Sequence, residues 1–361
     1  MDATGAPLGP AVSRMADDWP RSAPAPLIHA RLRAAPEDFV VEEQMPFTPA
    51  GAGEHLWLKI SKRGLNTDRA AQILAKAAGV ARRDVSYAGM KDRHAVTVQW
   101  FSLHLPGRTP EISALPPGLE VLEAVRHTRK LRIGALAGNR FTIVLRECTG
   151  DREATTRRIE ELRVRGVPNY FGEQRFGREG GNLERARAMF SGADTSGDRK
   201  LRGIYLSAAR SWLFNEVLAR RVADGTWDRM LEGDVMILNG SRSFFVPEAI
   251  DETLLRRLGE GDIHPSGPLW GRGELPTQGR VRDLEQAIAA EHSGFATGLE
   301  AAGLEQERRA LRVIPKEIEA EWFDAATLRL RFSLPAGTYA TAVLRELADY
   351  RTEDHAGGGS G

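Results

Sequence analysis

Residues 86–105 read SYAGMKDRHAVTVQWFSLHL, a turn that leads into a strand. The turn contains Gly89, and the apolar, β-prone second half of the stretch is typical of a strand. Three charged residues, Lys91, Asp92 and Arg93, stand between the two parts. The pattern predicts one carboxylate between two cations at the start of a strand. A lone aspartate in a turn is more often structural than catalytic, so these residues alone assign it no role.

The composition is that of a globular protein. The chain has 361 residues, which favours two domains, and 42% of them are hydrophobic and 27% charged. No apolar run approaches the ~18 residues that cross a bilayer, and the N-terminus lacks the order of a signal peptide. Cys148 is the only cysteine, which excludes a disulfide and a thiolate metal cage and favours a cytoplasmic location.

The net charge of +1 hides a segregated distribution. Residues 62–93 contain eight Lys or Arg and three Asp, and residues 126–146 contain six Lys or Arg and no acid. Acidic stretches at 251–262 and 285–307 offset this excess. Segregated charge suits a polyanionic partner. Solvated helix faces explain the same pattern equally well.

Hydrophobic periodicity predicts two strand-rich ends around a helical block. The first end is expected to hold strands at 38–43, 55–61, 121–126 and 140–147 and a helix that begins at Asn66 or Thr67. The middle is expected to hold helices at 151–165, 204–222 and 284–300, short strands at 234–238 and 244–246, and a rigid loop at 264–271. A strand at 326–334 and a helix at 339–350 follow. This order suggests a domain inserted into another.

Most familiar catalytic motifs are absent from the sequence. There is no Gly-x-x-x-x-Gly-Lys-[Ser/Thr] loop, no His-Glu-x-x-His and no Gly-x-Ser-x-Gly elbow. The eight histidines have no metal-ligand spacing, so no metal site is predicted.

The stretch SYAGMKDRHAVTVQWF resembles the catalytic signature of the TruD family of tRNA pseudouridine synthases. Other stretches resemble further blocks of that family in the family's order: LRAAPEDFVVEE, KRGLNT, RHTRKLRIGALAGNRFTIVLRE, VPNYFGEQRFGREGGNLERA, LSAARSWLFNE and LPAGTYATAVLREL. The resemblance covers about residues 31–350. So many long blocks in order are far more specific than a short motif.

The resemblance implies an α+β fold. A pseudouridine synthase catalytic domain, with a mixed or antiparallel sheet of two ferredoxin-like halves, is interrupted by an inserted α+β domain. The implied parts are a disordered lead-in at 1–26, catalytic segments at 27–160 and 306–350, the inserted domain at 161–305, and a flexible tail at 351–361.

The resemblance also implies a reaction, the isomerisation of uridine to pseudouridine within tRNA, at uridine 13 in the D-stem region. Nothing is oxidised and no group is donated, so no cofactor is expected. Asp92 is the implied essential carboxylate and acts on the ribose. It either attacks C1′ or takes a proton from C2′, and the sequence leaves both routes open.

The resemblance also implies roles for individual residues in the other blocks. Arg33, where the family commonly has Lys, is expected to pair with Asp92. Asn139 is expected to hydrogen-bond near Asp92. Phe141 is expected to stack on the extruded uracil, although its alternation along a strand also fits core packing. Phe39 lines the pocket or belongs to the core.

Contacts to RNA are expected from two groups of residues. The basic stretches contribute Lys62, Arg63, Asn66, Arg129, Lys130 and Arg132. The VPNYFGEQRFG block contributes Tyr170, Phe171, Gln174 and Arg175, which either close over the RNA or form an aromatic cluster between the domains.

Two other function classes remain open. A non-catalytic RNA-binding protein could keep the same fold without using Asp92. A glycosidic hydrolase would need a second acid, for which Glu37, Asp38 and Glu173 are the candidates. The partners expected are tRNA, with no membrane and no obligatory protein partner, and the chain is expected to be a monomer.

Overall fold

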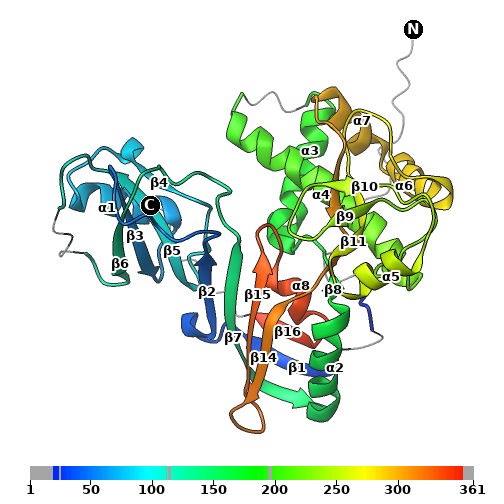
Figure 1. Cartoon of the computed structure of the whole chain (residues 1–361), viewed down its shortest axis with the longest axis horizontal. Helices are drawn as coiled ribbons and strands as arrows, with labels where there is room; N and C mark the ends of the chain where they lie inside the picture. The colour runs from blue at the N-terminus through cyan, green and yellow to red at the C-terminus, as the bar shows by residue number, and fades with distance from the viewer. Residues whose placement is uncertain (1–18, 24–25, 111, 113–114, 194–196, 353–361) are drawn as a thin grey trace. The chain divides into compact units, whose positions relative to one another are not determined.

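The computed structural model describes residues 19–23, 26–110, 112, 115–193 and 197–352 (Figure 1). The chain forms two compact units. The sheet unit comprises Pro26–Glu160, Pro315–Gly337 and the residues from Leu347 onward. The helical unit comprises the residues up to Ala25, Glu161–Ile314 and Thr338–Glu346. The predicted domain boundaries stay a prediction, and these units group residues 306–314 and 338–346 with the helical unit.

The sheet unit is built on one mixed sheet with the strand order β14-β15-β7-β2-β5-β3-β6, to which β1, β16 and β4 are attached. These strands are β1 (Ile28–Leu32), β2 (Phe39–Gln44), β3 (His55–Lys62), β4 (Val85–Tyr87), β5 (Val96–His104), β6 (Leu119–His127), β7 (Gly138–Gly150), β14 (Lys316–Trp322), β15 (Leu328–Pro335) and β16 (Ala348–Thr352). The pairs β2/β5 and β1/β16 are parallel, and β7 runs antiparallel to β1, β2 and β15. The predicted α+β class with a mixed sheet is confirmed.

Helix α1 (Thr67–Ala77) covers part of this sheet (Figure 1). Asn66 caps the helix, because its side chain accepts a hydrogen bond from the Arg69 N–H at 2.7 Å. The apolar face of α1 packs against Leu58 and Ile60 of β3. Trp57 lies on the other face of β3 and is also buried, in a second cluster. Strand β3 therefore has apolar packing on both faces. Short 3-10 turns at Pro36–Asp38 and Arg82–Asp84 complete this unit, and α2 (Arg152–Arg165) crosses the boundary between the units.

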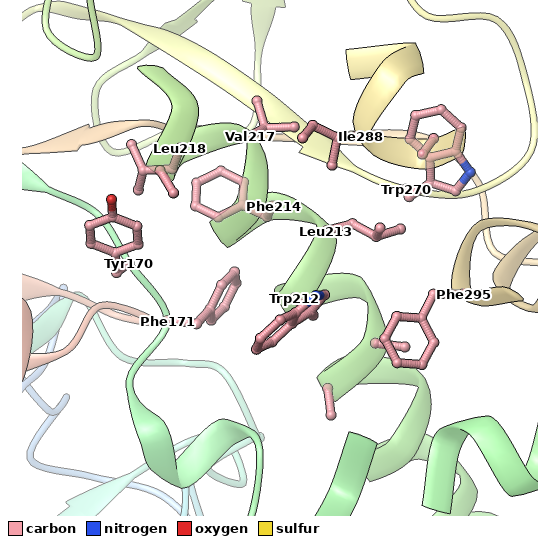
Figure 2. Packing of buried hydrophobic residues seen from close by; sticks show 14 of the residues in the cluster. Tyr170, Phe171, Trp212, Leu213, Phe214, Val217, Leu218, Trp270, Ile288 and Phe295 are labelled. Atoms are coloured by element: carbon pink, nitrogen blue, oxygen red, sulfur yellow. The ribbon is translucent and has the colours of Figure 1, made fainter. Parts of the chain in front are cut away.

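The helical unit packs around α4 (Arg199–Ala223), whose side chains are drawn in Figure 2. Its other helices are α3 (Gly181–Phe190), α5 (Glu252–Gly259), α6 (Gly279–Glu291), α7 (Ser293–Ala301) and α8 (Ala340–Leu344), with 3-10 turns at Glu173–Arg175 and Arg178–Gly180. Its strands are β8 (Val167–Pro168), β9 (Met236–Leu238), β10 (Phe244–Phe245), β11 (Ile263–Leu269), β12 (Glu307–Ala310) and β13 (Arg312–Val313). Trp212 and Phe214 of α4 lie at the centre of its core.

Three local predictions need correction. The expected rigid loop at 264–271 is mostly strand β11, which pairs with β9 and β12. The expected helix at 339–350 is the short α8 followed by β16, because residues 348–352 hydrogen-bond in parallel with β1. That strand includes residues 351 and 352 of the predicted tail, and the rest of the tail lies outside the described residues.

The predicted lead-in also needs correction in part. Trp19 is buried, with its ring centroid 5.0 Å from that of Trp212 and 5.9 Å from that of Tyr170. The end of the lead-in is therefore part of the core of the helical unit, while residues 1–18 and 24–25 lie outside the described residues. Among the helices that the structure describes, none is both long and apolar enough to cross a bilayer.

Candidate active site

Asp92 lies in the segment between β4 and β5, and both of its carboxylate oxygens have a partner. Oδ2 is 3.0 Å from Nη1 of Arg33, and Oδ1 accepts a hydrogen bond from the His94 N–H at 3.0 Å. The second contact closes a local turn of the kind that Asp commonly forms. Each side chain of the Arg33–Asp92 pair is 23% exposed. The carboxylate is therefore oriented by two donors and still reachable from solvent, and a cation at this distance favours its ionised form.

Arg33 reaches Asp92 from the turn that follows β1. Its φ of 61° lies in the left-handed region, which costs a non-glycine residue on the order of 1 kcal/mol or more. Its guanidinium carbon is 4.3 Å from the centre of the Phe39 ring. The guanidinium thus bridges the carboxylate and an aromatic face, as its planar charged group allows.

Asp38 stabilises the turn that carries Arg33. Its buried carboxylate accepts a hydrogen bond from the Ala35 N–H at 2.9 Å and two-pronged hydrogen bonds from Arg146 of β7. The bonds to Asp38 raise the pKa of Arg146 above its ordinary value. Since Asp38 is fully engaged, it is not available as the second acid of a glycosidic hydrolase. Glu37, another candidate for that role, pairs with Arg63 at 2.8 Å.

The aromatic face continues from Phe39 to Phe141. These two rings meet edge to face with centroids 6.3 Å apart, and the ring of Phe141 is 5.5 Å from that of Phe332 on the other side. Contacts therefore join Asp92, Arg33, Phe39 and Phe141 into one continuous site, within the sheet unit. Phe141 is only 6% exposed, so the residue packs almost entirely in the core.

Asn139 lies on the same face of β7 as Phe141, two residues earlier, and opposite Glu43 of β2. Its Oδ1 is buried and has no hydrogen-bond partner among the residues that the structure describes. A buried acceptor without a donor costs about 1–3 kcal/mol. Asn139 thus offers an unused acceptor beside the aromatic face.

Lys91, the neighbour of Asp92, points to Glu43 rather than to Asp92. Its Nζ is 2.7 Å from the Glu43 carboxylate, and Glu43 also accepts a hydrogen bond from the Trp100 N–H at 2.8 Å. Burial raises the pKa of Glu43, an effect that the charge of Lys91 opposes. The backbone N–H of Lys91 donates to Thr67 Oγ1 at 2.9 Å. These contacts fix the segment that carries Asp92 independently of the Arg33 pair.

Three of the predicted RNA contacts are wrong. The side chain of Lys62 is 1% exposed and donates to backbone carbonyls, so it cannot offer its ammonium to a phosphate. Tyr170 and Phe171 are 2% and 7% exposed and belong to the core around α4 (Figure 2). Burial raises the pKa of Tyr170, whose hydroxyl donates to the Pro20 carbonyl at 3.1 Å, and the guanidinium of Arg309 lies 4.0 Å from the centre of the Phe171 ring.

The other predicted RNA contacts lie at the surface, except for one that is half-buried. The exposed ones are Arg63, Asn66, Arg129, Lys130, Arg132 and Gln174. Arg175 is half-buried and donates to Tyr339 Oη at 3.1 Å and to Ser207 Oγ at 2.9 Å. Within the described ranges there is no cluster of three or more His, Cys, Asp or Glu that could hold a metal ion.

Sequence comparison defines the class of this protein. The sequence model of the family described as tRNA pseudouridine synthase D (TruD) matches residues 22–186 and 181–347. The chain therefore belongs to the TruD family. It is an isomerase that acts on tRNA, a pseudouridine synthase.

Individual relatives agree with the family match. The chain is 50% identical to the tRNA pseudouridine synthase D of Xanthomonas axonopodis pv. citri over 347 residues, which cover 91% of this chain and 94% of the relative. It is 49% identical to that of Hydrogenovibrio crunogenus over 327 residues, which cover 90% and 94%. A crystal structure from Methanosarcina mazei, of a protein assigned as tRNA pseudouridine synthase D, superposes with a TM-score of 0.69 at 24% identity. It covers 90% of this chain and 95% of that chain and supports the fold.

Proposed function

We propose that Asp92 is the essential carboxylate in the conversion of a tRNA uridine to pseudouridine. The arrangement of Asp92 carries this proposal: a partly exposed carboxylate, held by Arg33 and the His94 N–H, at the edge of an aromatic face. In the reaction the bond from N1 to C1′ breaks, the base turns, and C5 bonds to C1′. C5 loses its proton and N1 gains one, so the product is an isomer. Because no co-reactant enters this balance, we propose that no cofactor is used.

Two routes to the detached base use the same carboxylate. Asp92 either attacks C1′ or removes a proton from C2′ to leave a glycal. Both routes require an ionised carboxylate in contact with the ribose. The Arg33 cation stabilises the ionised form in either route. Arg33 affects the reaction indirectly, because it pairs with the Asp92 carboxylate. Its own position is stabilised by the ring of Phe39, on which the guanidinium lies.

The neighbouring residues provide a place for the base. The unused Oδ1 of Asn139 is a suitable acceptor for a uracil N–H or a ribose hydroxyl. A contact between the Phe141 ring and the uracil would involve no hydrogen bond, which leaves the base free to turn. Phe39 lies behind Arg33 and supports this face.

Basic and polar residues of the chain suit an RNA that presents an extruded nucleotide. Removing a stacked base from a helix costs a few kcal/mol, and phosphate contacts offset that cost. We assign these contacts to Arg63, Asn66, Arg129, Lys130, Arg132, Gln174 and Arg175. We further propose uridine 13 in the D-stem region as the target, a monomeric enzyme and a cytoplasmic location. The match to the TruD family supports tRNA as the substrate, and the position is proposed on the resemblance of the sequence blocks.

The test measures tritium released from C5-labelled uridine in tRNA transcripts. Wild type should release it from a transcript with uridine 13 and not from the same transcript with cytidine there. Asp92→Asn should lower the rate by about 10⁴-fold. The matched control is Glu42→Gln, which changes an acid to an amide in a surface pair with Lys59 and should keep the wild-type rate. An active Asp92→Asn variant would disprove the role of Asp92, and release from the cytidine-13 transcript would disprove the target.

A further inference from the structure

A buried amine lies beneath the segment that carries Asp92. Lys62 is the last residue of β3, and its side chain is 1% exposed. Its Nζ is 2.8 Å from the carbonyl oxygen of Leu65, 3.2 Å from that of Asp92 and 3.5 Å from that of Lys91. A protonated amine has three N–H donors, so the three carbonyls use its full capacity.

These bonds tie two distant segments together at the candidate site. The Leu65 carbonyl belongs to the loop before α1, and the other two carbonyls belong to the segment before β5. The same segment is also held by the Gly89 carbonyl, which accepts a hydrogen bond from Gln99 Nε2 at 2.6 Å, and by the contacts of Lys91 with Glu43 and Thr67. The contact from Lys62 to the Asp92 carbonyl acts on the backbone of Asp92 itself.

We propose that Lys62 is a positioning residue for the reaction, which holds the backbone at residues 91–92 so that the Asp92 carboxylate stays against Arg33. The inference rests on the role proposed above for Asp92. Lys62 itself does not face the substrate, because its ammonium is enclosed by backbone.

The charges around Lys62 make this contact sensitive to pH. Asp92 and Glu43 stabilise its charged form, and Lys91 opposes it. Its strand neighbours Thr97 of β5 and Leu119 of β6 carry no charge. Burial is the largest effect and lowers the pKa of Lys62 from 10.5 to about 8. Above that pH the neutral amine keeps only two donors for three carbonyls.

The contribution of Lys62 to stability and its effect on activity should then change in opposite directions as pH rises. Because the folded pKa of Lys62 is below its ordinary value, the unfolded chain binds more protons between pH 8 and 10.5. This group therefore makes the free energy of unfolding rise with pH in that window. Positioning of Asp92 weakens in the same window, so kcat/KM should fall as pH rises through about 8. Alkaline unfolding would instead lower both quantities together.

The test compares Lys62→Met with Lys59→Met, a change three residues earlier in β3 at a lysine that pairs with Glu42 on the surface. For Lys62→Met we expect a kcat about 10²-fold lower, a nearly unchanged KM, and no alkaline fall of kcat/KM near pH 8. Lys59→Met should keep the wild-type rate and the alkaline fall. If Lys62→Met keeps the wild-type rate and the alkaline fall of kcat/KM, Lys62 does not position Asp92.

A second measurement does not depend on activity. Backbone hydrogen exchange of residues 88–94, corrected for intrinsic rates, should be about tenfold faster in Lys62→Met and unchanged in Lys59→Met. Unchanged exchange in Lys62→Met would overturn the inference even if the wild-type enzyme were inactive on every RNA tried. Failure of the proposed function appears separately, as wild type that releases no tritium.

Discussion

Candidate residues from different family-like sequence blocks lie in opposite environments. In the sheet unit, Asp92 and Arg33 are partly exposed and paired at the edge of an aromatic face. In the helical unit, Tyr170 and Phe171 of the VPNYFGEQRFG block are buried around α4 (Figure 2). All three blocks resemble the same family, yet those of Arg33 and Asp92 supply polar groups at the surface, whereas Tyr170 and Phe171 supply core packing. A family block therefore identifies important positions without telling whether they contact a ligand.

The charged and aromatic side chains explain this difference. An ionised side chain loses much free energy when it is buried without partners, so Asp92 and Arg33 stay near the surface. Burial of an aromatic ring is favourable, and Tyr170 and Phe171 lie in the core cluster around α4. The predictions below test whether this division is correct.

The largest effect on stability is expected for Phe171→Ala. Its ring lies between Arg309, 4.0 Å away, and Phe214, with ring centroids 5.5 Å apart. We expect the free energy of unfolding to fall by about 3–5 kcal/mol, measured by urea denaturation. Gln174→Ala, an exposed neighbour, should change it by less than about 0.5 kcal/mol. If Phe171→Ala had normal stability and weaker tRNA binding, Phe171 would contact the RNA and not the core.

The next effect concerns the partner of Asp92. Arg33→Met should lower kcat/KM by about 10²–10³-fold, because it removes the cation that is 3.0 Å from the carboxylate. Arg33→Lys keeps the charge but loses the planar group above Phe39, so about a tenfold loss should remain. Single-turnover kinetics with saturating tRNA separates this effect from binding. Equal rates for Arg33→Met and wild type would mean that the pair is structural.

A matched pair of substitutions separates base contact from core packing. Phe141 and Phe332 are register partners whose rings share one contact, but Phe141 is 6% exposed and Phe332 is 1% exposed. Each change to Leu should cost about 1 kcal/mol of stability. Only Phe141→Leu should also lower kcat, by about tenfold, because a ring that contacts a base is lost. If both variants lower kcat equally, Phe141 acts only through packing.

The smallest effect is expected at the basic surface. Replacing Lys130 and Arg132 by Gln should reduce the slope of log tRNA affinity against log salt concentration by about 1–2 in magnitude. The kcat at saturating tRNA should stay unchanged. The control replaces Arg199 and Lys200, exposed residues at the start of α4, by Gln and should leave the slope as in wild type. An unchanged slope in the first variant excludes these two residues from phosphate contact.

Much of the sheet unit follows from local sequence. The period of two in β2, β3 and β7 and the Asn66 cap of α1 depend only on neighbouring residues, and both agree with the structure. The same period also predicts the burial of Lys62. Lys62 lies on the same face of β3 as Leu58 and Ile60, and all three are buried. The positive charge of Lys62 instead suggested a phosphate contact.

The sequence by itself determined the family, the α+β class and the identity of Asp92 as the leading candidate. Only the tertiary structure decided which side chains are enclosed and which strands pair. Residues 348–350 are predicted to be helical and 351–352 to be tail, yet β1, more than 300 positions away, pairs with them as a parallel strand. Trp19 packs on Tyr170, and Lys62 donates to the Asp92 carbonyl, so both have partners that are distant in the sequence. Burial and backbone pairing depend on groups far apart in the chain, so their free energies are decided only when the chain has folded.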